Sequence, residues 1–469
     1  MKASEAPMKS LADNTLLSKI PCEFNFDGGK LSSDAGCLLF ADFMGRMAFN
    51  KMIRSVWESY FVQSTSRHSS ADVLMQKIFL HIAGYHTDDA SDHLATDPAF
   101  QLMMGKKRLA SQPTVSRFNS KLNKLTLNIL RRIQQFIRMT AYSVDRPSSV
   151  MLDIDTTILA TYGSQEGGEY IHHYGAVGYH PVVVYDSNTG DIIRAELRHG
   201  SQYCGADADK FLEPVLDEYN VQYPDTKITV RGDSGFAMPA LYNLVEKYPQ
   251  AGYVIRLKNN STLLEKITQA SSSLLEQAAS SHTDKTLVSY GEFRYKAGSW
   301  PKERRIAYKL TKKTDELFVV PMFIVTTEES LTPKEVVDLY CKRGSMENLI
   351  KESKNSFGFR HMRSHTFIVN DNLLQISAIA HNLFNLFHRL CLCKNWRTMQ
   401  ADTIRLRLLK IAGRMIKHGR KIKISLASGC HYQEVFYKAL ERIRTMRQIS
   451  LANIDNALKR PYEQPVRSA

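Results

Sequence analysis

The chain has 469 residues, enough for about three domains of ordinary size. It carries 62 Lys and Arg residues against 47 Asp and Glu residues, a formal net charge of +15, and 43% of its residues are hydrophobic. This composition excludes a disordered or collagen-like protein and predicts a basic globular chain.

The start of the chain and the cysteines bear on where the protein is located. The segment Met1–Pro7 lacks the apolar core of a secretory signal, and the most apolar later stretch, 375–393, is interrupted by polar residues. Seven cysteines are scattered along the chain, as in a reduced cytosolic protein. One Cys-x-Cys segment, Cys391 to Cys393, is too small a set to indicate a metal site. We therefore expect a cytoplasmic protein without a membrane span.

Sequence patterns divide the chain into six regions. Apolar residues recur at helical spacing between residues 70 and 140, and an alternating pattern typical of strands begins at residue 149. The expected regions are a mixed N-terminal segment (1–66), a helical region (67–145), the first part of an α/β core (146–258), a β-rich insertion (259–327), the second part of the core (328–395) and a basic helical C-terminal region (396–469).

A short helix is predicted within Leu109–Phe118. Ser111 is a plausible N-cap and Pro113 suits a first helical turn. The polar side chains of this helix are types that a recognition helix offers to bases or phosphates, namely Gln112, Thr114, Ser116 and Arg117. A plain capped helix in a bundle explains the pattern equally well.

The core is predicted to contain three strands in a meander, then helix, strand, helix and strand. The predicted strands are 150–155, 181–185, 192–197, 227–231 and 253–257, with helices at 207–219 and 239–247. In the first strand, Asp153 and Asp155 point to the same face, opposite to Leu152 and Ile154.

Two aspartates follow predicted strands and are candidates for chemistry. Asp155 ends the first strand, with Asp153 as the competing choice, and Asp233 follows the fourth strand between two glycines. Cleavage of a phosphodiester by two divalent cations about 4 Å apart needs carboxylates from several elements, because Mg²⁺ prefers hard oxygen ligands. A turn-forming or capping role is the alternative for each aspartate taken singly.

The third acidic candidate lies in a segment, 338–354, that we predict to be one helix. At about 100° per residue, four of its polar side chains fall on one narrow stripe: Tyr340, Arg343, Glu347 and Lys354. Glu352 lies about 120° from the start of that stripe, which favours Glu347 as the metal ligand. A solvated face with incidental ion pairs is the alternative.

The spacing of these four residues resembles the signature around the third acid of the DDE transposases of bacterial insertion sequences. Asp155, followed by Thr156 and Thr157, is similar to the first acid of that family, and Asp233 to its second. Segments at 26–29, 109–118 and 197–200 resemble the IS-thirteen-eighty group, and the similarity extends over nearly the whole chain. The resemblance implies an α/β fold: an RNase H-like mixed sheet core with a β-rich insertion, flanked by helical N-terminal and C-terminal regions.

The resemblance also implies roles. Asp155, Asp233 and Glu347 would be catalytic and would hold two Mg²⁺ ions, which Mn²⁺ could replace. Contacts to the DNA end would come from Tyr340, Arg343, Lys351 and Lys354. Trp300 would stack on a displaced base, although ordinary packing is an alternative for it. The expected partners are double-stranded DNA, as terminal inverted repeats and as target, and a second copy in a homodimer on DNA, in a bacterial cytoplasm near the nucleoid.

The C-terminal region strengthens the expectation of a polyanionic partner. Between residues 397 and 447 stand 13 basic residues against three acidic ones, a net charge of +10. A solvated helical face is the simpler explanation of a charge run taken alone. Two rival functions remain beside cut-and-paste transposition: a nuclease of the same fold that cleaves without joining, and a DNA-binding regulator with a vestigial core.

Overall fold

The computed structural model describes residues 8–9, 23–24, 26–60, 67–280, 286–314 and 316–447. The segment Met1–Pro7 and Cys22, on which part of the expected location depended, lie outside these residues. None of the helices in these ranges combines the length and the apolar composition of a membrane-spanning segment.

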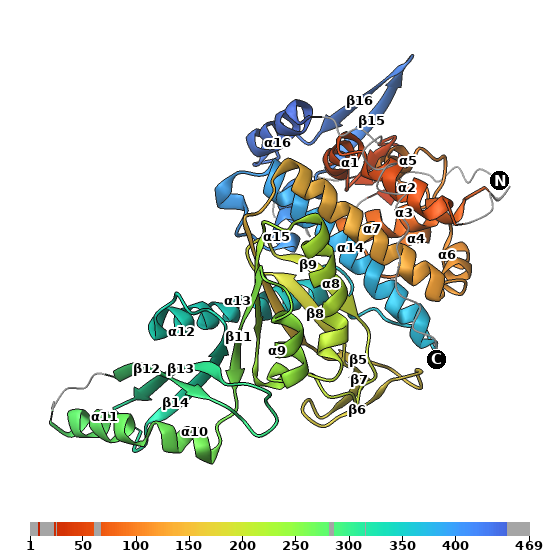
Figure 1. The fold of residues 1–469 in the computed structure, drawn as a ribbon. Helices are drawn as coiled ribbons and strands as arrows, with labels where there is room; N and C mark the ends of the chain where they lie inside the picture. The colour runs from red at the N-terminus through yellow and green to blue at the C-terminus, as the bar shows by residue number, and fades with distance from the viewer. Residues whose placement is uncertain are drawn as a thin grey trace.

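An eight-stranded mixed sheet forms the centre of the molecule (Figure 1), in the order β12-β13-β14-β11-β10-β4-β8-β9. Its core strands are β4 (Ser149–Thr156), β8 (Val182–Asp186), β9 (Asp191–Glu196), β10 (Lys227–Gly232) and β11 (Ala251–Leu257). The strands β4, β10 and β11 are parallel, whereas β8 and β9 pair antiparallel beside β4. This is the meander followed by two helix–strand units that the sequence predicted, and the RNase H-like fold class is confirmed.

Helices cover both faces of this sheet. On one face, α8 (Ala208–Gln222) and α9 (Pro239–Val245) pack against apolar side chains that include Leu152 and Ile154. On the other face, α13 (Ser345–Ser356) and α14 (Phe367–Cys391) pack against Val183 and Tyr185. The period of two predicted for the first strand is therefore confirmed, and both of its aspartates belong to the second face.

The N-terminal region is helical, as predicted. Its helices are α1 (Cys37–Arg46), α2 (Phe49–Glu58), α3 (Ser70–Ala83), α4 (Ala90–His93), α5 (Pro98–Met104), α6 (Gln112–Asn119) and α7 (Lys124–Val144). The long helices α7 and α14 lie side by side and join this bundle to the edge of the sheet at β9.

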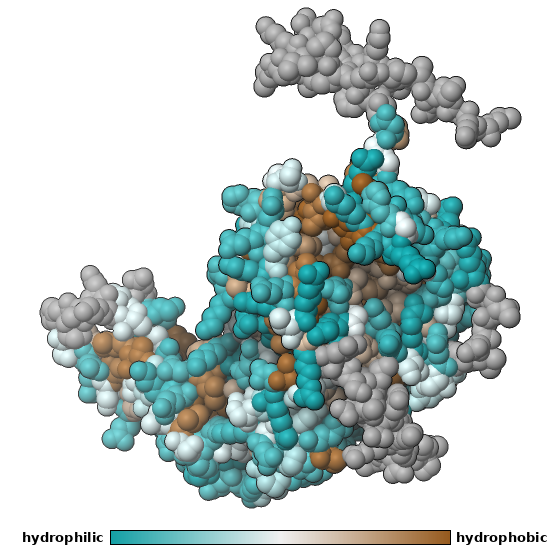
Figure 2. Space-filling model, turned by 90° about the horizontal axis from the view of Figure 1, so that it is seen from above, coloured by the Kyte–Doolittle hydropathy of each residue, from teal (hydrophilic) through white to brown (hydrophobic). Residues whose placement is uncertain are grey.

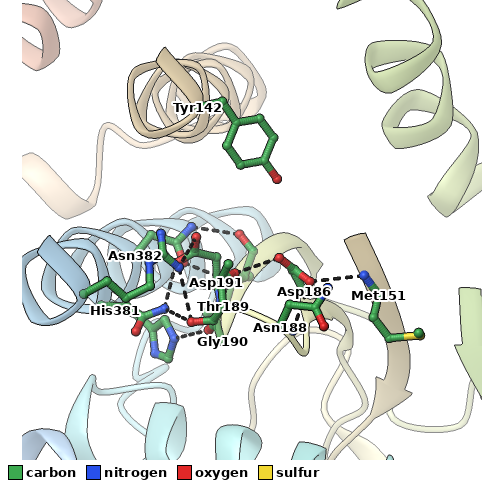
Figure 3. Close-up of polar contacts among 12 residues, drawn as sticks. Tyr142, Met151, Asp186, Asn188, Thr189, Gly190, Asp191, His381 and Asn382 are labelled. Atoms are coloured by element: carbon green, nitrogen blue, oxygen red, sulfur yellow. Dashed lines mark hydrogen bonds and ion pairs between the residues drawn. The ribbon is translucent and has the colours of Figure 1, made fainter. Parts of the chain in front are cut away.

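Polar side chains of α14 anchor the turn between β8 and β9 (Figure 3). Asn382 pairs with both backbone groups of Ile192 (2.8 Å each), and His381 Nε2 lies 3.0 Å from the Gly190 carbonyl oxygen. Within the turn, the Asp186 carboxylate accepts hydrogen bonds from the Met151 and Asn188 backbone N–H groups and from Thr189 Oγ1. Burial raises the pKa of Asp186 to about 6, and its hydrogen bonds oppose the rise. These contacts hold α14 in a defined position on the sheet.

The insertion between the two halves of the core begins with helices that the sequence analysis did not predict. They are α10 (Ser261–Lys266) and α11 (Thr268–Ser280), followed by β12 (Leu287–Tyr295), β13 (Arg304–Lys312) and β14 (Val320–Thr326). The Asn260 side chain caps α10, and the buried Leu263, Ile267 and Leu274 recur at helical spacing within a Ser-rich segment. Because β14 pairs with β11, the insertion continues the main sheet and projects from the body (Figure 1).

Short strands complete the described structure. β5 (Leu159–Ala160), β6 (Glu169–Ile171) and β7 (Ala176–Tyr179) form a three-stranded sheet that the sequence did not predict, because strands this short show no clear alternation. The C-terminal region holds α15 (Ala401–Ile404) and α16 (Gln433–Thr445) and, in addition, a hairpin of β15 (Gly413–His418) and β16 (Lys421–Leu426). The N-terminal strands are β1 (Met8–Lys9), β2 (Glu23–Phe24) and β3 (Leu31–Ser32), and β3 pairs with β15.

Seen from above, after a turn of 90° from the view of Figure 1, the surface is mainly hydrophilic with separate hydrophobic patches (Figure 2). Apolar side chains are otherwise concentrated in the core described above.

Candidate active site

Asp155 and Asp233 lie at neighbouring strand ends. Strands β4 and β10 are parallel, and their register pairs Ile154 with Gly232. The residue that follows each of these two is an aspartate. Because the carboxyl ends of parallel strands share one edge, the two carboxylates meet there. The two aspartates are close enough for the charge of Asp233 to raise the pKa of Asp155.

The Asp155 carboxylate is largely buried and is paired with a cation. Arg343 Nη2 lies 2.7 Å from Asp155 Oδ2, and the Thr156 backbone N–H donates to Oδ1 at 2.8 Å. Burial raises the pKa of Asp155 to about 6, with Arg343 opposing the rise and Asp233 adding to it. Arg343 Nε is buried without a hydrogen-bond partner in the described structure.

Asp153, the competing candidate for the first acid, is engaged in a buried ion pair. Its side chain is fully buried, and both of its oxygens lie 2.6 Å from the Arg231 guanidinium on the adjacent strand β10. Arg231 also donates to the Leu339 carbonyl oxygen at 2.6 Å, which ties the sheet to the helix above it. A carboxylate held on both oxygens by one guanidinium has little capacity for another ligand.

Asp233 has the capping geometry that the sequence analysis gave as its alternative role. Its Oδ1 accepts a hydrogen bond from the Gly235 backbone N–H at 2.8 Å, which begins a short 3-10 turn, η1 (Ser234–Phe236). The side chains that lie near enough for its charge to raise their pKa values include Cys204 and Tyr174, in each case after burial as the larger cause. Sequence reasoning missed both, because they lie in segments without a strong periodic pattern.

The segment that carries the third acid is not one helix. It divides into α12 (Pro333–Cys341), a 3-10 turn η2 (Lys342–Gly344) and α13. The stripe predicted at about 100° per residue does not continue through a 3-10 turn, which has about 120° per residue. The single-helix prediction was therefore wrong, and Gly344 explains why, since glycine weakens a helix interior.

Glu347 is exposed in the first turn of α13. Within the described ranges, no group of three or more His, Cys, Asp or Glu side chains is arranged to hold a metal. Asp155 and Asp233 fit a divalent cation in chemistry and position, whereas Glu347 does not complete the set as placed. Glu352, the rejected alternative, accepts a hydrogen bond from the Ala401 backbone N–H at 2.6 Å.

The other residues of the predicted stripe lie in different surroundings. Tyr340 is a buried residue of α12, and burial raises its pKa, opposed by Arg343 and by Arg256, which also hydrogen-bonds its side chain. Arg256 is exposed on β11 and was missed, although a cation in an otherwise apolar strand was a visible signal. Lys354 is half-buried, and burial lowers its pKa to about 8, with the nearby Arg360 adding to the effect. Lys351 is exposed.

Trp300 is only 6% exposed and lies against Tyr242, Tyr295 and the Arg304 guanidinium. It also lines a cavity of about 260 Å³, together with Ser234, the residue after Asp233. The tryptophan is thus packed, as its alternative reading held, but on the wall of a cavity beside the strand end that carries Asp233.

The predicted helix at 109–118 is present as α6. Ser116 and Arg117 are exposed, whereas Val115 and Phe118 bind α6 to the helical core. Gln112 and Thr114 are half-exposed, and Thr114 Oγ1 accepts from Arg117 at 3.2 Å. An exposed polar side opposite a packed apolar side is expected of a recognition helix and equally of a plain capped helix in a bundle.

Comparisons with known proteins bear on the family. The sequence matches the family model described as "Transposase DDE domain group 1" over residues 14–448, whereas a search of curated proteins finds no match. Among solved structures, the chain is similar to the piggyBac transposase in a synaptic complex with hairpin DNA (13% identity, 92% of this chain, 87% of that chain, TM-score 0.41). It is also similar to the Mos1 transposase of a pre-cleavage transpososome (12% identity, 45% and 67%, TM-score 0.16). These TM-scores are low, and the assignment rests on the sequence match: the chain belongs to the DDE transposases.

Proposed function

We propose that this transposase moves its element by a cut-and-paste reaction on DNA. It binds the terminal inverted repeats, hydrolyses the phosphodiester bonds at the element ends, and joins the freed 3′-OH groups to target DNA. Asp155, Asp233 and Glu347 are the proposed catalytic acids, and membership of the IS-thirteen-eighty group remains a prediction.

The observation that carries this proposal is the meeting of two aspartates at the ends of β4 and β10, under a guanidinium. Carboxylates collected at the carboxyl ends of parallel strands, on a fold of this topology, suit cation-assisted chemistry on phosphate. The engagement of Asp153 by Arg231 favours Asp155 as the first acid.

Asp155 and Asp233 would hold a divalent cation, proposed to be Mg²⁺ with Mn²⁺ as a substitute, and Glu347 would join them once DNA is bound. Such a cation, when present, supplies Lewis-acid stabilisation of the charge that develops on phosphate oxygens.

Arg343 has a defined part in this proposal. Its position beside Asp155 allows the guanidinium to donate to a phosphate oxygen of the DNA end. A phosphate that attracts the guanidinium weakens its pairing with Asp155, so the entry of DNA makes this carboxylate available. Tyr340, Lys351 and Lys354 would contact the same DNA end, and Trp300 would contribute its face to the neighbouring cavity.

A dimer on DNA is proposed because two element ends must be cut and joined together. One observation favours the regulator as a second candidate: as placed, Asp155 is neutralised by Arg343 and Glu347 stands apart from the aspartates.

The test uses a plasmid that carries a marker gene between two DNA segments. These segments are the DNA that flanks the coding region on either side, and they supply the terminal repeats. Purified protein with Mg²⁺ is expected to excise the marker and insert it into a second plasmid. Cuts without insertions would indicate the nuclease, and binding without cuts would indicate the regulator. Absence of binding, cuts and insertions would contradict the proposal.

A further inference from the structure

The basic side chains of the C-terminal region differ in whether they have partners within the folded chain. Lys410 Nζ lies 2.6 Å from Asp34 Oδ1, and Arg405 Nη1 lies 2.6 Å from Asp402 Oδ1. The Arg407 guanidinium lies over the ring of Tyr432. These positive charges are satisfied internally, so they contribute little to a surface that attracts a polyanion.

The hairpin β15–β16 is different. It contains no acidic residue, and its five basic side chains are all exposed: Arg414, Lys417, Arg420, Lys421 and Lys423. None of the five forms an ion pair with a carboxylate of the residues that the structure describes. Part of the basic character predicted from the sequence is therefore carried by this hairpin without neutralising ion pairs.

The strand register separates the hairpin into two faces. Ile416 pairs with Lys423, His418 with Lys421 and Arg414 with Ser425, so these six side chains share one face, and three of them are cations. On the opposite face, Met415 pairs with Ile424 and Lys417 with Ile422. Arg420 occupies the two-residue turn beside Gly419, whose φ of 56° suits such a turn.

The base of the hairpin is held firmly while its end is free. β15 pairs with β3, the Met415 backbone N–H donates to the Lys30 carbonyl oxygen at 2.9 Å, and the Met415 side chain is buried with Ala35 and Ala99. Beyond Met415 the two strands extend away from the helical body (Figure 1). Four residues from Met415 to the turn give a projection of about 13 Å at about 3.3 Å per residue.

We propose that the β15–β16 hairpin is a DNA-binding arm that sets its cationic face against the phosphates of duplex DNA. The inference rests on the proposed function, since it takes DNA as the substrate. A two-stranded ribbon fits the major groove, which is about 12 Å wide and about 8.5 Å deep, so the projecting end is long enough to enter it. Lysine and arginine contacts to phosphate release counterions, which gives the arm a measurable signature.

The test compares two triple variants of the full chain that lose the same charge. One carries Arg420→Gln, Lys421→Gln and Lys423→Gln in the hairpin, and the control carries Lys51→Gln, Lys247→Gln and Lys266→Gln at exposed sites elsewhere. Binding to a labelled duplex is measured by fluorescence anisotropy over a series of salt concentrations. The slope of log affinity against log salt is negative, and its magnitude is expected to decrease by about 3 in the hairpin variant, one unit for each lost phosphate contact, and by less than about 1 in the control.

Equal slopes in the two variants would overturn the inference while leaving the proposed function intact, provided that the wild type cleaves element ends. A hairpin variant that loses affinity for anionic lipid vesicles but keeps its affinity for duplex DNA would also overturn it. A wild type that binds no duplex DNA would overturn both proposals. Circular dichroism of both variants checks that the fold is retained, and, because the substitutions lie on a solvent-exposed hairpin, we expect unchanged spectra.

Discussion

The two halves of the candidate site are built differently. At the sheet edge, Asp155 and Asp233 are positioned by the hydrogen-bonded register of β4 and β10, which leaves little freedom. In the helical half, Glu347 follows a 3-10 turn between two helices, and it is exposed. We infer that the sheet acids are preorganised, whereas the helical acid depends on how α13 is held and on what binds there.

How α13 is held can be seen in its second half. Ser353 Oγ lies 2.8 Å from Tyr185 Oη on β8 and 3.2 Å from His381 Nδ1 on α14. The Glu352 carboxylate accepts a hydrogen bond from the Ala401 backbone N–H at the start of α15. The first half, with Glu347, has no such hydrogen bonds within the described residues, and it is held there by the packing of the buried Met346 in the cluster that contains Val183 and Tyr185.

The largest expected effect concerns the acids themselves. Asp155→Asn, Asp233→Asn and Glu347→Gln are each expected to lower the rate of end cleavage on the order of 1000-fold, because each removes a charged oxygen ligand, while binding to duplex DNA persists. Cleavage is measured on a labelled DNA end with Mg²⁺. Glu352→Gln serves as the control, and full cleavage by Glu347→Gln would confine the site to the sheet edge.

A second experiment sharpens the distinction between Asp153 and Asp155. Asp153→Asn is expected to lower the free energy of unfolding by about 3–5 kcal/mol, because it leaves the buried Arg231 without its partner. The measurement is denaturant unfolding followed by circular dichroism. Glu329→Gln, which removes an exposed partner of Arg294, is expected to cost less than about 1 kcal/mol. A small effect of Asp153→Asn would show that this pair does not hold the strands together.

The anchoring of α13 predicts a smaller loss. Ser353→Ala is expected to lower the free energy of unfolding by about 1–3 kcal/mol, since Tyr185 Oη loses its buried partner. Ser143→Ala on the exposed side of α7 is the matched control, with a change within about 0.5 kcal/mol. Equal changes in the two variants would mean that α13 is positioned by other contacts.

The smallest expected effect is on pH dependence. Burial lowers the pKa of Lys354 to about 8, so this side chain is a cation below that pH and becomes neutral above it. If Lys354 contacts a phosphate, affinity for the DNA end should fall a few-fold as pH rises from about 7 to 9, because binding then requires proton uptake. The dependence should be absent in Lys354→Gln and unchanged in Lys351→Gln. A dependence that persists in Lys354→Gln would remove this lysine from the DNA contact.

Local periodicity was sufficient for part of this structure. The alternation in β4 predicted that Asp153 and Asp155 share a face, and helical spacing predicted the N-terminal bundle and α8, because both patterns arise from backbone geometry within a few residues. It failed at residues 342–344, where the same rule was extended through a turn of different pitch.

The remaining features depend on contacts between residues far apart in the chain. Parallel pairing of β4 with β10 decided that Asp155 and Asp233 meet, and the same pairing gave Asp153 to Arg231. The pairing of β15 with β16 made a hairpin of a run of basic residues, and the pairing of β15 with β3 fixed the base of that hairpin on the body. By itself the amino-acid sequence determined which residue types were available and which face of each strand or helix they occupy. Only the tertiary structure decided which of them are neutralised by partners and which stay free, because a charge buried in the fold must find its counterpart wherever packing places it.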